Sequence, residues 1–211
     1  MKHLIIGLLL SLSGICLANE KPNVILILAD DMGVGEVSHN GELIPTPALD
    51  QMAAEGMRFT DAHTTSSVCT PTRYGILTGR YNWRSRLKSG VLVNVNSSAL
   101  MDPKRLNLGT FLQQSGYSTA CIGKWHLGAD WQAAPAKSAV AGKFASWKVD
   151  YTKPFKNGPI DVGFDQAFFL LSSLDMPPYL YLRDDRAVEV PRINRGFQHN
   201  EYNDYPFACI C

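Results

Sequence analysis

A cysteine, a proline and an arginine are spaced so that they could form an anion-binding site at the start of a helix. The segment reads Cys69-Thr70-Pro71-Thr72-Arg73. Proline is favoured in the first turn of a helix, and Arg73 follows Cys69 by one turn, so both side chains share a face. Helix-start N–H groups and a guanidinium both attract negative charge. A cysteine at this place suits a nucleophile, although a lone cysteine is more often a buried thiol.

Two adjacent carboxylates, Asp30 and Asp31, follow the apolar run 23–29. The run predicts a buried parallel strand that ends at the aspartates. Two carboxylates so close repel each other unless a cation lies between them, and their hard oxygens suit Ca²⁺ or Mg²⁺. An Asp-Asp pair alone is usually a solvated strand end. Its place after the first strand, with Gly33 and Gly35 beyond, favours a metal site.

A lysine and a histidine form the third candidate group, in the segment Gly123-Lys124-Trp125-His126-Leu127-Gly128. This segment ends the strand-like run 117–124, and strand alternation would place Lys124 and His126 on one face. An ammonium and an imidazole could then share a pocket. The ordinary alternative is that both side chains are solvated at a strand end.

Strands and helices alternate along the chain around these groups. Helices are predicted over 47–55 (after Thr46, stopped by Gly56), over 69–78 (closed by Gly79) and over 108–115 (ended by Gly116), and strands over 23–29, 57–62 and 117–124. The pattern predicts an α/β fold with a mainly parallel sheet flanked by helices. The site would lie at the carboxyl ends of the strands.

The later part of the chain has a weaker pattern. We interpret residues 129–160 as a surface excursion, because the periodicity gives way to Ala, Lys, Gly and Pro. Order returns with the apolar run 167–171. Residues 179–182 and 187–190 flank a charged turn and predict a hairpin.

Composition and the N-terminus narrow the functional class. The 211 residues are 45% hydrophobic and 18% charged with a formal net charge of +1, which predicts one globular domain and no nucleic-acid groove. Residues 1–18 have the pattern of a signal peptide, so we expect an exported protein, periplasmic or secreted, with a lysosomal-type compartment left open and no stable membrane span. The cysteines after residue 18 (Cys69, Cys121, Cys209 and Cys211) show no disulfide framework.

The three candidate groups, taken in order along the chain, resemble the type I sulfatases. These are the formylglycine-dependent arylsulfatases of the alkaline-phosphatase-like superfamily. The resemblance covers residues 23–190 and only the N-terminal part of such an enzyme, so we expect 19–211 to be the N-terminal portion of a sulfatase catalytic domain. It implies that a formylglycine-generating or sulfatase-maturing enzyme oxidises Cys69 to an aldehyde. One hydroxyl of the hydrated aldehyde attacks the sulfur of a sulfate ester, and loss of a proton from the other later expels sulfate.

The resemblance also implies roles for the other residues. Asp30, Asp31 and the modified Cys69 would hold a divalent cation, with Ca²⁺ favoured over Mg²⁺. Arg73 would steady the hydrated aldehyde near the metal. Lys124 would bind the sulfate.

Three further assignments come from the same resemblance. His126 would orient or deprotonate a hydroxyl of the modified residue 69. Ser173 and Asp175 would contact substrate, although a turn fixed by Pro177 and Pro178 is an equally good interpretation of that segment.

The predicted function is hydrolysis of sulfate esters on an aryl group or a carbohydrate, with a sulfated small molecule or glycan as the partner. Family members bring an Asp-Asn pair to the metal, and this chain has no Asp-Asn dipeptide. We therefore expect an incomplete enzyme with weak metal binding and slow or no turnover. Two alternatives stay open: a phosphonate or phosphodiester hydrolase of the same superfamily, and a secreted non-catalytic remnant that binds sulfated sugars.

Overall fold

The structure is a computed structural model of the chain, and it describes residues 21–38, 44–134, 149–176 and 178–190. The predicted signal peptide, residues 1–18, lies outside these ranges. Within them, no helix has the length and apolar composition needed to cross a membrane.

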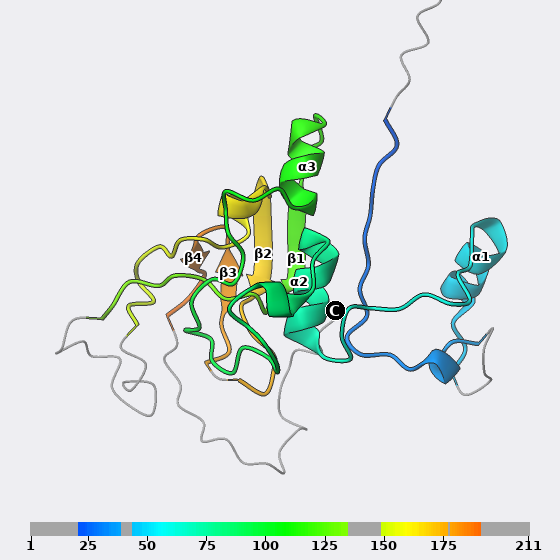
Figure 1. Cartoon of the computed structure of the whole chain (residues 1–211), viewed down its shortest axis with the longest axis horizontal. Coiled ribbons are helices and arrows are strands. Elements are labelled where there is room, and N and C mark those ends of the chain that lie inside the picture. Colours follow the sequence, from blue (N-terminus) through cyan, green and yellow to red (C-terminus); the bar gives the residue numbers. More distant parts are fainter. Residues whose placement is uncertain (1–20, 39–43, 135–148, 177, 191–211) are drawn as a thin grey trace, which may run out of the picture.

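A four-stranded sheet forms the centre of the main body (Figure 1). Its strands are β1 (Ala120–Lys124), β2 (Gln166–Leu170), β3 (Tyr181–Arg183) and β4 (Arg186–Ala187), in that spatial order. β1 and β2 are parallel, whereas β2–β3 and β3–β4 are antiparallel. The α/β class is as predicted, but the described sheet is mixed rather than mainly parallel. The predicted hairpin is present as β3 and β4.

The helices begin and end close to where capping residues place them. They are η1 (Val34–Glu36), α1 (Pro47–Glu55), α2 (Cys69–Thr78), η2 (Asn82–Arg84), α3 (Leu108–Gln114) and η4 (Ile160–Val162). Gly79 ends α2 in the left-handed conformation, with φ 63°, and donates its N–H to Gly75 O at 2.8 Å. Asn107 caps α3 by accepting from Thr110 N at 3.2 Å.

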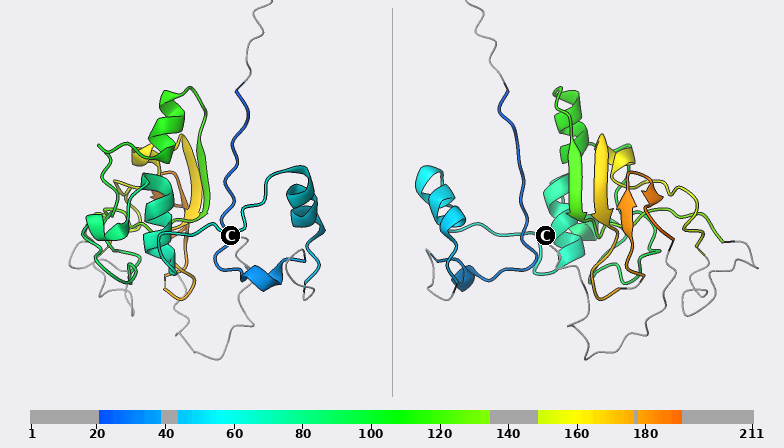
Figure 2. Two further views of the ribbon diagram at one scale, coloured as in Figure 1. Left: turned by 45° about the vertical axis from the view of Figure 1, so that its right-hand side comes forward. Right: turned by 180° about the vertical axis from the view of Figure 1, so that it is seen from behind.

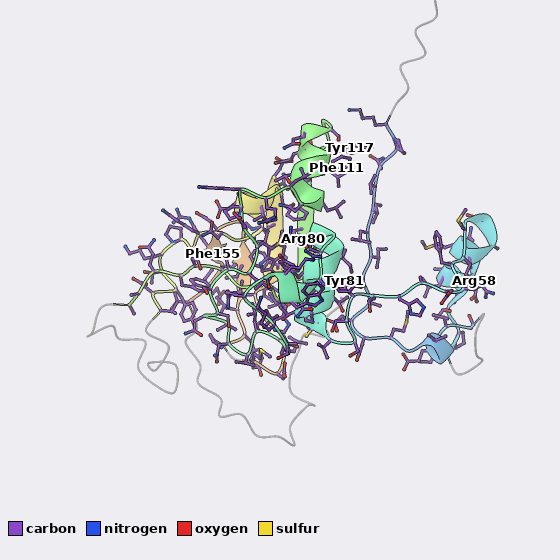
Figure 3. All side chains as sticks on the ribbon, viewed as in Figure 1. Arg58, Arg80, Tyr81, Phe111, Tyr117 and Phe155 are labelled. Carbon is purple, nitrogen blue, oxygen red and sulfur yellow. The ribbon has the colours of Figure 1, made fainter. Side chains whose placement is uncertain are left out.

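The helices divide between the main body, which contains the sheet, and a separate arm, which contains η1 and α1. α2 and α3 lie beside β1, whereas α1 and η1 lie away from the sheet, at the end of the arm (Figure 1). Figure 2 shows the same separation from two further directions. In Figure 3, Arg58 accompanies α1 in the arm, while Phe155 lies in the main body.

The apolar core packs against the sheet and reaches into the segment that we interpreted as a surface excursion. Phe169 and Leu182 are its fully buried strand residues. Ala129 is also fully buried, and the Trp131 ring lies 4.9 Å from that of Phe155. Asp130 pairs with Lys156 in an antiparallel bridge. The predicted surface excursion over 129–160 is therefore wrong for its described parts, 129–134 and 149–160. Aromatic rings that are far apart in sequence pack together there.

The predicted first strand is also wrong for the described structure. Residues 23–29 run alongside the main body without joining its sheet (Figure 1). The side chains of residues 24–27 are exposed, with Ile25 at 82%, and Leu28 is half-buried. The predicted strand 57–62 is likewise absent from the sheet of the described residues. A strand needs a partner for its N–H and C=O groups, and an apolar run cannot supply one.

Candidate active site

Three segments that are distant in sequence meet at the carboxylate of Asp30. Arg73 Nη2 and Lys124 Nζ each lie 2.7 Å from the same oxygen, Asp30 Oδ2. Arg73 Nη1 also donates to the backbone carbonyl of Lys124. All three side chains are largely buried. The structure thus brings together three of the residues that the sequence predicted.

The charges of this cluster favour an anion. Burial alone would raise the pKa of Asp30, but hydrogen bonds and charge from Lys124 and Arg73 outweigh burial, and the pKa lies below its usual value. Asp30 is therefore ionised at neutral pH. Two cations beside one carboxylate leave a surplus positive charge in a partly desolvated place, where it acts more strongly than in water.

Cys69 is the first residue of α2, one turn before Arg73 on the same face. Its thiol is free and half-buried. Two hydrogen bonds tie the preceding loop to the start of the helix: Thr72 Oγ1 donates to Ser66 O at 2.7 Å, and Thr65 Oγ1 donates to Pro71 O at 3.1 Å. The backbone on both sides of Cys69 is therefore fixed, which suits a residue that must react in one orientation.

His126 is buried and held at both its backbone and its ring. Its backbone N–H donates to Leu171 O at 2.9 Å, and Nε2 lies 2.8 Å from Leu92 O. A carbonyl oxygen only accepts, so Nε2 carries the proton of the neutral ring and Nδ1 is a bare acceptor. Nδ1 is buried and has no hydrogen-bond partner within the described ranges.

The environment of His126 keeps the ring neutral. Burial lowers its pKa most, and the charges of Lys124 and Arg73 lower it further, whereas the bond to Leu92 and the charge of Asp175 act in the opposite direction. The net pKa lies below the usual value. A neutral ring with a bare nitrogen can accept a proton or a hydrogen bond near neutral pH.

Strand alternation does not explain how Lys124 and His126 are placed. β1 ends at Lys124, and His126 lies beyond it with φ 54°, in the left-handed region. Lys124 contacts Asp30, and His126 contacts Leu92. The sequence did not single out Leu92, because a backbone carbonyl leaves no signature in residue type.

The other predicted residues take less central places. Asp31 is exposed, and its peptide bond to Asp30 is cis. Asp175 is exposed, and the N–H of Met176 closes a turn by donating to Ser173 O at 3.0 Å. The turn interpretation of this segment therefore accounts for Ser173, and substrate contact by Ser173 and Asp175 stays a prediction.

Asp30 and Asp31 provide the type of ligand that a hard divalent cation needs, but they provide too few ligand atoms. Asp30 and Asp31 offer the oxygen ligands that Ca²⁺ prefers, but that ion takes six to eight of them. Asp30 Oδ2 is already occupied by Arg73 and Lys124. In the part of the chain that the structure describes, no three His, Cys, Asp or Glu side chains are grouped to hold a metal ion.

Comparison with known proteins identifies the family of this chain. The family model described as Sulfatase matches residues 22–188. The N-acetylgalactosamine-6-O-sulfatase of Bacteroides thetaiotaomicron is 32% identical over 171 residues, which cover 81% of this chain and 30% of that protein. Human arylsulfatase G is 44% identical over 129 residues, 58% of this chain and 24% of that protein.

Solved structures agree with the sequence comparison. One from a study of glycosaminoglycan metabolism by Bacteroides thetaiotaomicron superposes with a TM-score of 0.67 at 32% identity, over 80% of this chain and 32% of that one. The crystal structure of Ps i-CgsB in complex with k-i-k-neocarrahexaose superposes with a TM-score of 0.54 at 28% identity. The superposition covers 73% of this chain and 29% of that one. The chain spans about a third or less of the proteins it matches. It belongs to the sulfatase family.

Proposed function

We propose that this chain is part of a sulfate ester hydrolase whose reacting group is made by oxidising Cys69 to formylglycine. The observation that carries the proposal is the cluster of Asp30, Arg73 and Lys124 one turn from Cys69, in a chain that belongs to the sulfatase family. The cluster offers a fixed positive site for the sulfuryl oxygens beside the residue that would react with the sulfur.

When oxidised and hydrated, residue 69 supplies one hydroxyl oxygen that attacks the sulfur while the alcohol or phenol of the ester leaves. Its second hydroxyl then loses a proton, so that the aldehyde re-forms and sulfate is expelled. The neighbouring side chains have separate tasks. Lys124 holds the sulfate through charge. Arg73 keeps Asp30 and the end of β1 in place through its two nitrogen contacts, and it would steady residue 69 one turn earlier on α2. His126 accepts the hydroxyl proton at Nδ1, which is the ring nitrogen left free by Leu92.

Asp30, Asp31 and the oxidised residue 69 would hold a divalent cation, with Ca²⁺ favoured over Mg²⁺. The cation would supply further positive charge against the charge that builds on the sulfuryl oxygens. Because these donors are few, we expect the chain alone to bind Ca²⁺ weakly and to turn over slowly or not at all.

The substrate is proposed to be a sulfated carbohydrate or an aryl sulfate. Two of the matched proteins are described with N-acetylgalactosamine-6-O-sulfatase activity and with a bound neocarrahexaose, which favours a sulfated glycan. We further propose that residues 1–18 direct export and that a formylglycine-generating or sulfatase-maturing enzyme acts on Cys69.

The test uses the chain coexpressed with a maturing enzyme and assayed on paired 4-nitrophenyl sulfate and phosphate with Ca²⁺. We expect sulfate release, even if slow, to exceed phosphate release and to vanish in Cys69→Ala. A preference for phosphate esters or diesters would instead identify the phosphonate and phosphodiester alternative.

A non-catalytic remnant that binds sulfated sugars is the second candidate, favoured by the small number of metal donors grouped among the described residues. It predicts that a sulfated oligosaccharide binds equally well to wild type and Cys69→Ala, and that conversion of Cys69 adds no turnover. Isothermal titration with sulfated and desulfated forms of one oligosaccharide distinguishes the two candidates.

A further inference from the structure

A buried hydrogen-bonded path links Thr70 to His126 through the backbone of Leu92. Thr70 Oγ1 accepts from Leu92 N at 3.2 Å, and Leu92 O accepts from His126 Nε2 at 2.8 Å. The exposed fractions are 0% for Thr70, 5% for Leu92 and 1% for His126. We propose that Thr70 is a positioning residue, which holds His126 in its Nε2–H tautomer by fixing the direction of the Leu92 carbonyl. This inference rests on the proposed function for its catalytic meaning.

Leu92 needs such a support because it lies outside any helix or strand. No ladder of backbone bonds therefore sets the direction of its carbonyl. The Thr70 hydroxyl fixes the peptide group before Leu92, and the buried leucine side chain fixes the residue within the core. Together they restrict the rotation of Leu92 that sets the direction of its carbonyl, which lies within hydrogen-bond distance of the His126 ring.

The tautomer matters because it decides which nitrogen can accept a proton. With Nε2 protonated and bound to Leu92, the bare nitrogen is Nδ1, buried and without a partner in the described structure. If the Leu92 carbonyl turned away, either nitrogen could carry the proton. A fraction of molecules would then present N–H where an acceptor is needed.

The path also couples the two reacting residues. Thr70 follows Cys69 directly in α2, whereas His126 follows the end of β1. The backbone near His126 is itself fixed by Leu171 O and by the bond from Leu100 N to Leu127 O at 2.8 Å. Thr70 therefore ties the helix that carries the reacting residue to the loop that carries the proton acceptor.

The experiment measures the His126 tautomer by ¹⁵N NMR of the ring nitrogens in the unconverted protein at pH 7.5, assigned from the spectrum of His126→Gln. Thr70→Val removes the accepting oxygen at nearly constant shape, and Thr70→Ser keeps it. We expect Nε2–H in wild type and Thr70→Ser, and a second population with Nδ1–H in Thr70→Val. Thr78→Val is the matched control, because the Thr78 hydroxyl donates within α2, to Tyr74 O at 2.6 Å.

Two results would overturn the proposal: wild type already in the Nδ1–H form, or Thr70→Val with an unchanged Nε2–H signal. The first result is measured on the wild type alone, so the proposal can be overturned even if Thr70→Val does not fold. In that case Thr70→Ala replaces Thr70→Val in the second measurement. In matured protein, we expect Thr70→Val to lower kcat about ten- to a hundredfold with KM nearly unchanged, and Thr70→Ser to restore it.

Maturation is checked in each variant by mass spectrometry, because Thr70 lies within the segment that the maturing enzyme must read. If Cys69 stays an unmodified cysteine in the coexpressed wild type, the proposed function fails, while the tautomer measurement still decides the role of Thr70.

Discussion

Lys124 Nζ lies 2.7 Å from Asp30 Oδ2, and this contact joins the end of β1 to the residue that directly follows the extended segment 23–29. The pair is largely buried and shares its carboxylate with Arg73. Its position explains how a segment outside the sheet still reaches the site: the contact is electrostatic and does not need a strand partner. Lys124 therefore fixes Asp30, and its proposed second role is to bind the sulfate.

Replacing Lys124 tests both roles. We expect Lys124→Met to destabilise the fold by about 1.5–3 kcal/mol, because a charged hydrogen bond is lost while Asp30 stays partly buried. In matured protein, sulfate ester hydrolysis should fall by about 10²–10³-fold. Urea unfolding and initial rates measure the two effects. Lys104→Met is the control on an exposed lysine, and equal behaviour of the two variants would contradict the account.

His126 predicts how stability varies with pH. The folded-state pKa lies below the ordinary value of about 6.5, so the unfolded chain binds a proton first as the pH falls. Stability from neutral His126 is thus complete above about pH 6.5 and declines below it, toward the folded-state pKa. The urea midpoint should fall between pH 7.5 and 5.5, and the fall should be smaller in His126→Gln.

The exposed His63 supplies the matched control for this titration. His63→Gln controls for the loss of a histidine at an exposed position outside the site. Asp30 does not affect this comparison of urea midpoints. Because its pKa is lowered, the stability that it contributes is lost only at a pH well below 5.5. Parallel pH profiles for wild type and His126→Gln would show that the histidine is not held neutral by the fold.

Gly128 allows the loop after His126 to approach the segment around Ser98. Its φ is 72°, and a Cβ there would lie 2.3 Å from Ser98 O. Gly79 has φ 63° with open space around it, so Gly79→Ala measures the conformational cost alone. We expect about 1 kcal/mol for Gly79→Ala and at least 1–3 kcal/mol more for Gly128→Ala, from unfolding in urea. Similar losses in both would mean that the close approach is not required.

Cys121 should resist alkylation while the protein is folded. Burial raises the pKa of its thiol to about 12, against a smaller opposing effect of Arg73, so the reactive thiolate is scarce at pH 8. Peptide mapping after brief iodoacetamide treatment should find Cys121 unmodified in native protein and modified in urea. Rapid modification of Cys121 in the native protein would contradict the raised pKa of this half-buried thiol.

The sequence predicted the features that depend on neighbouring residues. α1 and α2 begin and end where Thr46, Pro47, Gly56 and Gly79 indicate, because caps and helix stops are local signals. The motifs also singled out Asp30, Arg73 and Lys124, which the fold brings together.

The remaining features depend on distant partners. The run 23–29 is apolar enough for a buried strand, but residues 24–27 are exposed because no described strand pairs with the run. Trp131 and Phe155 pack together although no local pattern links them. The sequence could not indicate the roles of Leu92 and Thr70. Leu92 contributes a backbone carbonyl and Thr70 a buried hydroxyl, and the partners of both groups are set by the fold.

The central claim is that residue 69 becomes an aldehyde, and mass spectrometry of the peptide that contains it is the most direct measurement. The chain is coexpressed with a formylglycine-generating enzyme, with Arg73→Ala as the variant that breaks the modification motif. We predict the mass of formylglycine at position 69 in wild type and of an intact cysteine in Arg73→Ala. An unmodified cysteine in wild type, under conditions that convert a known sulfatase in the same cells, would contradict the account.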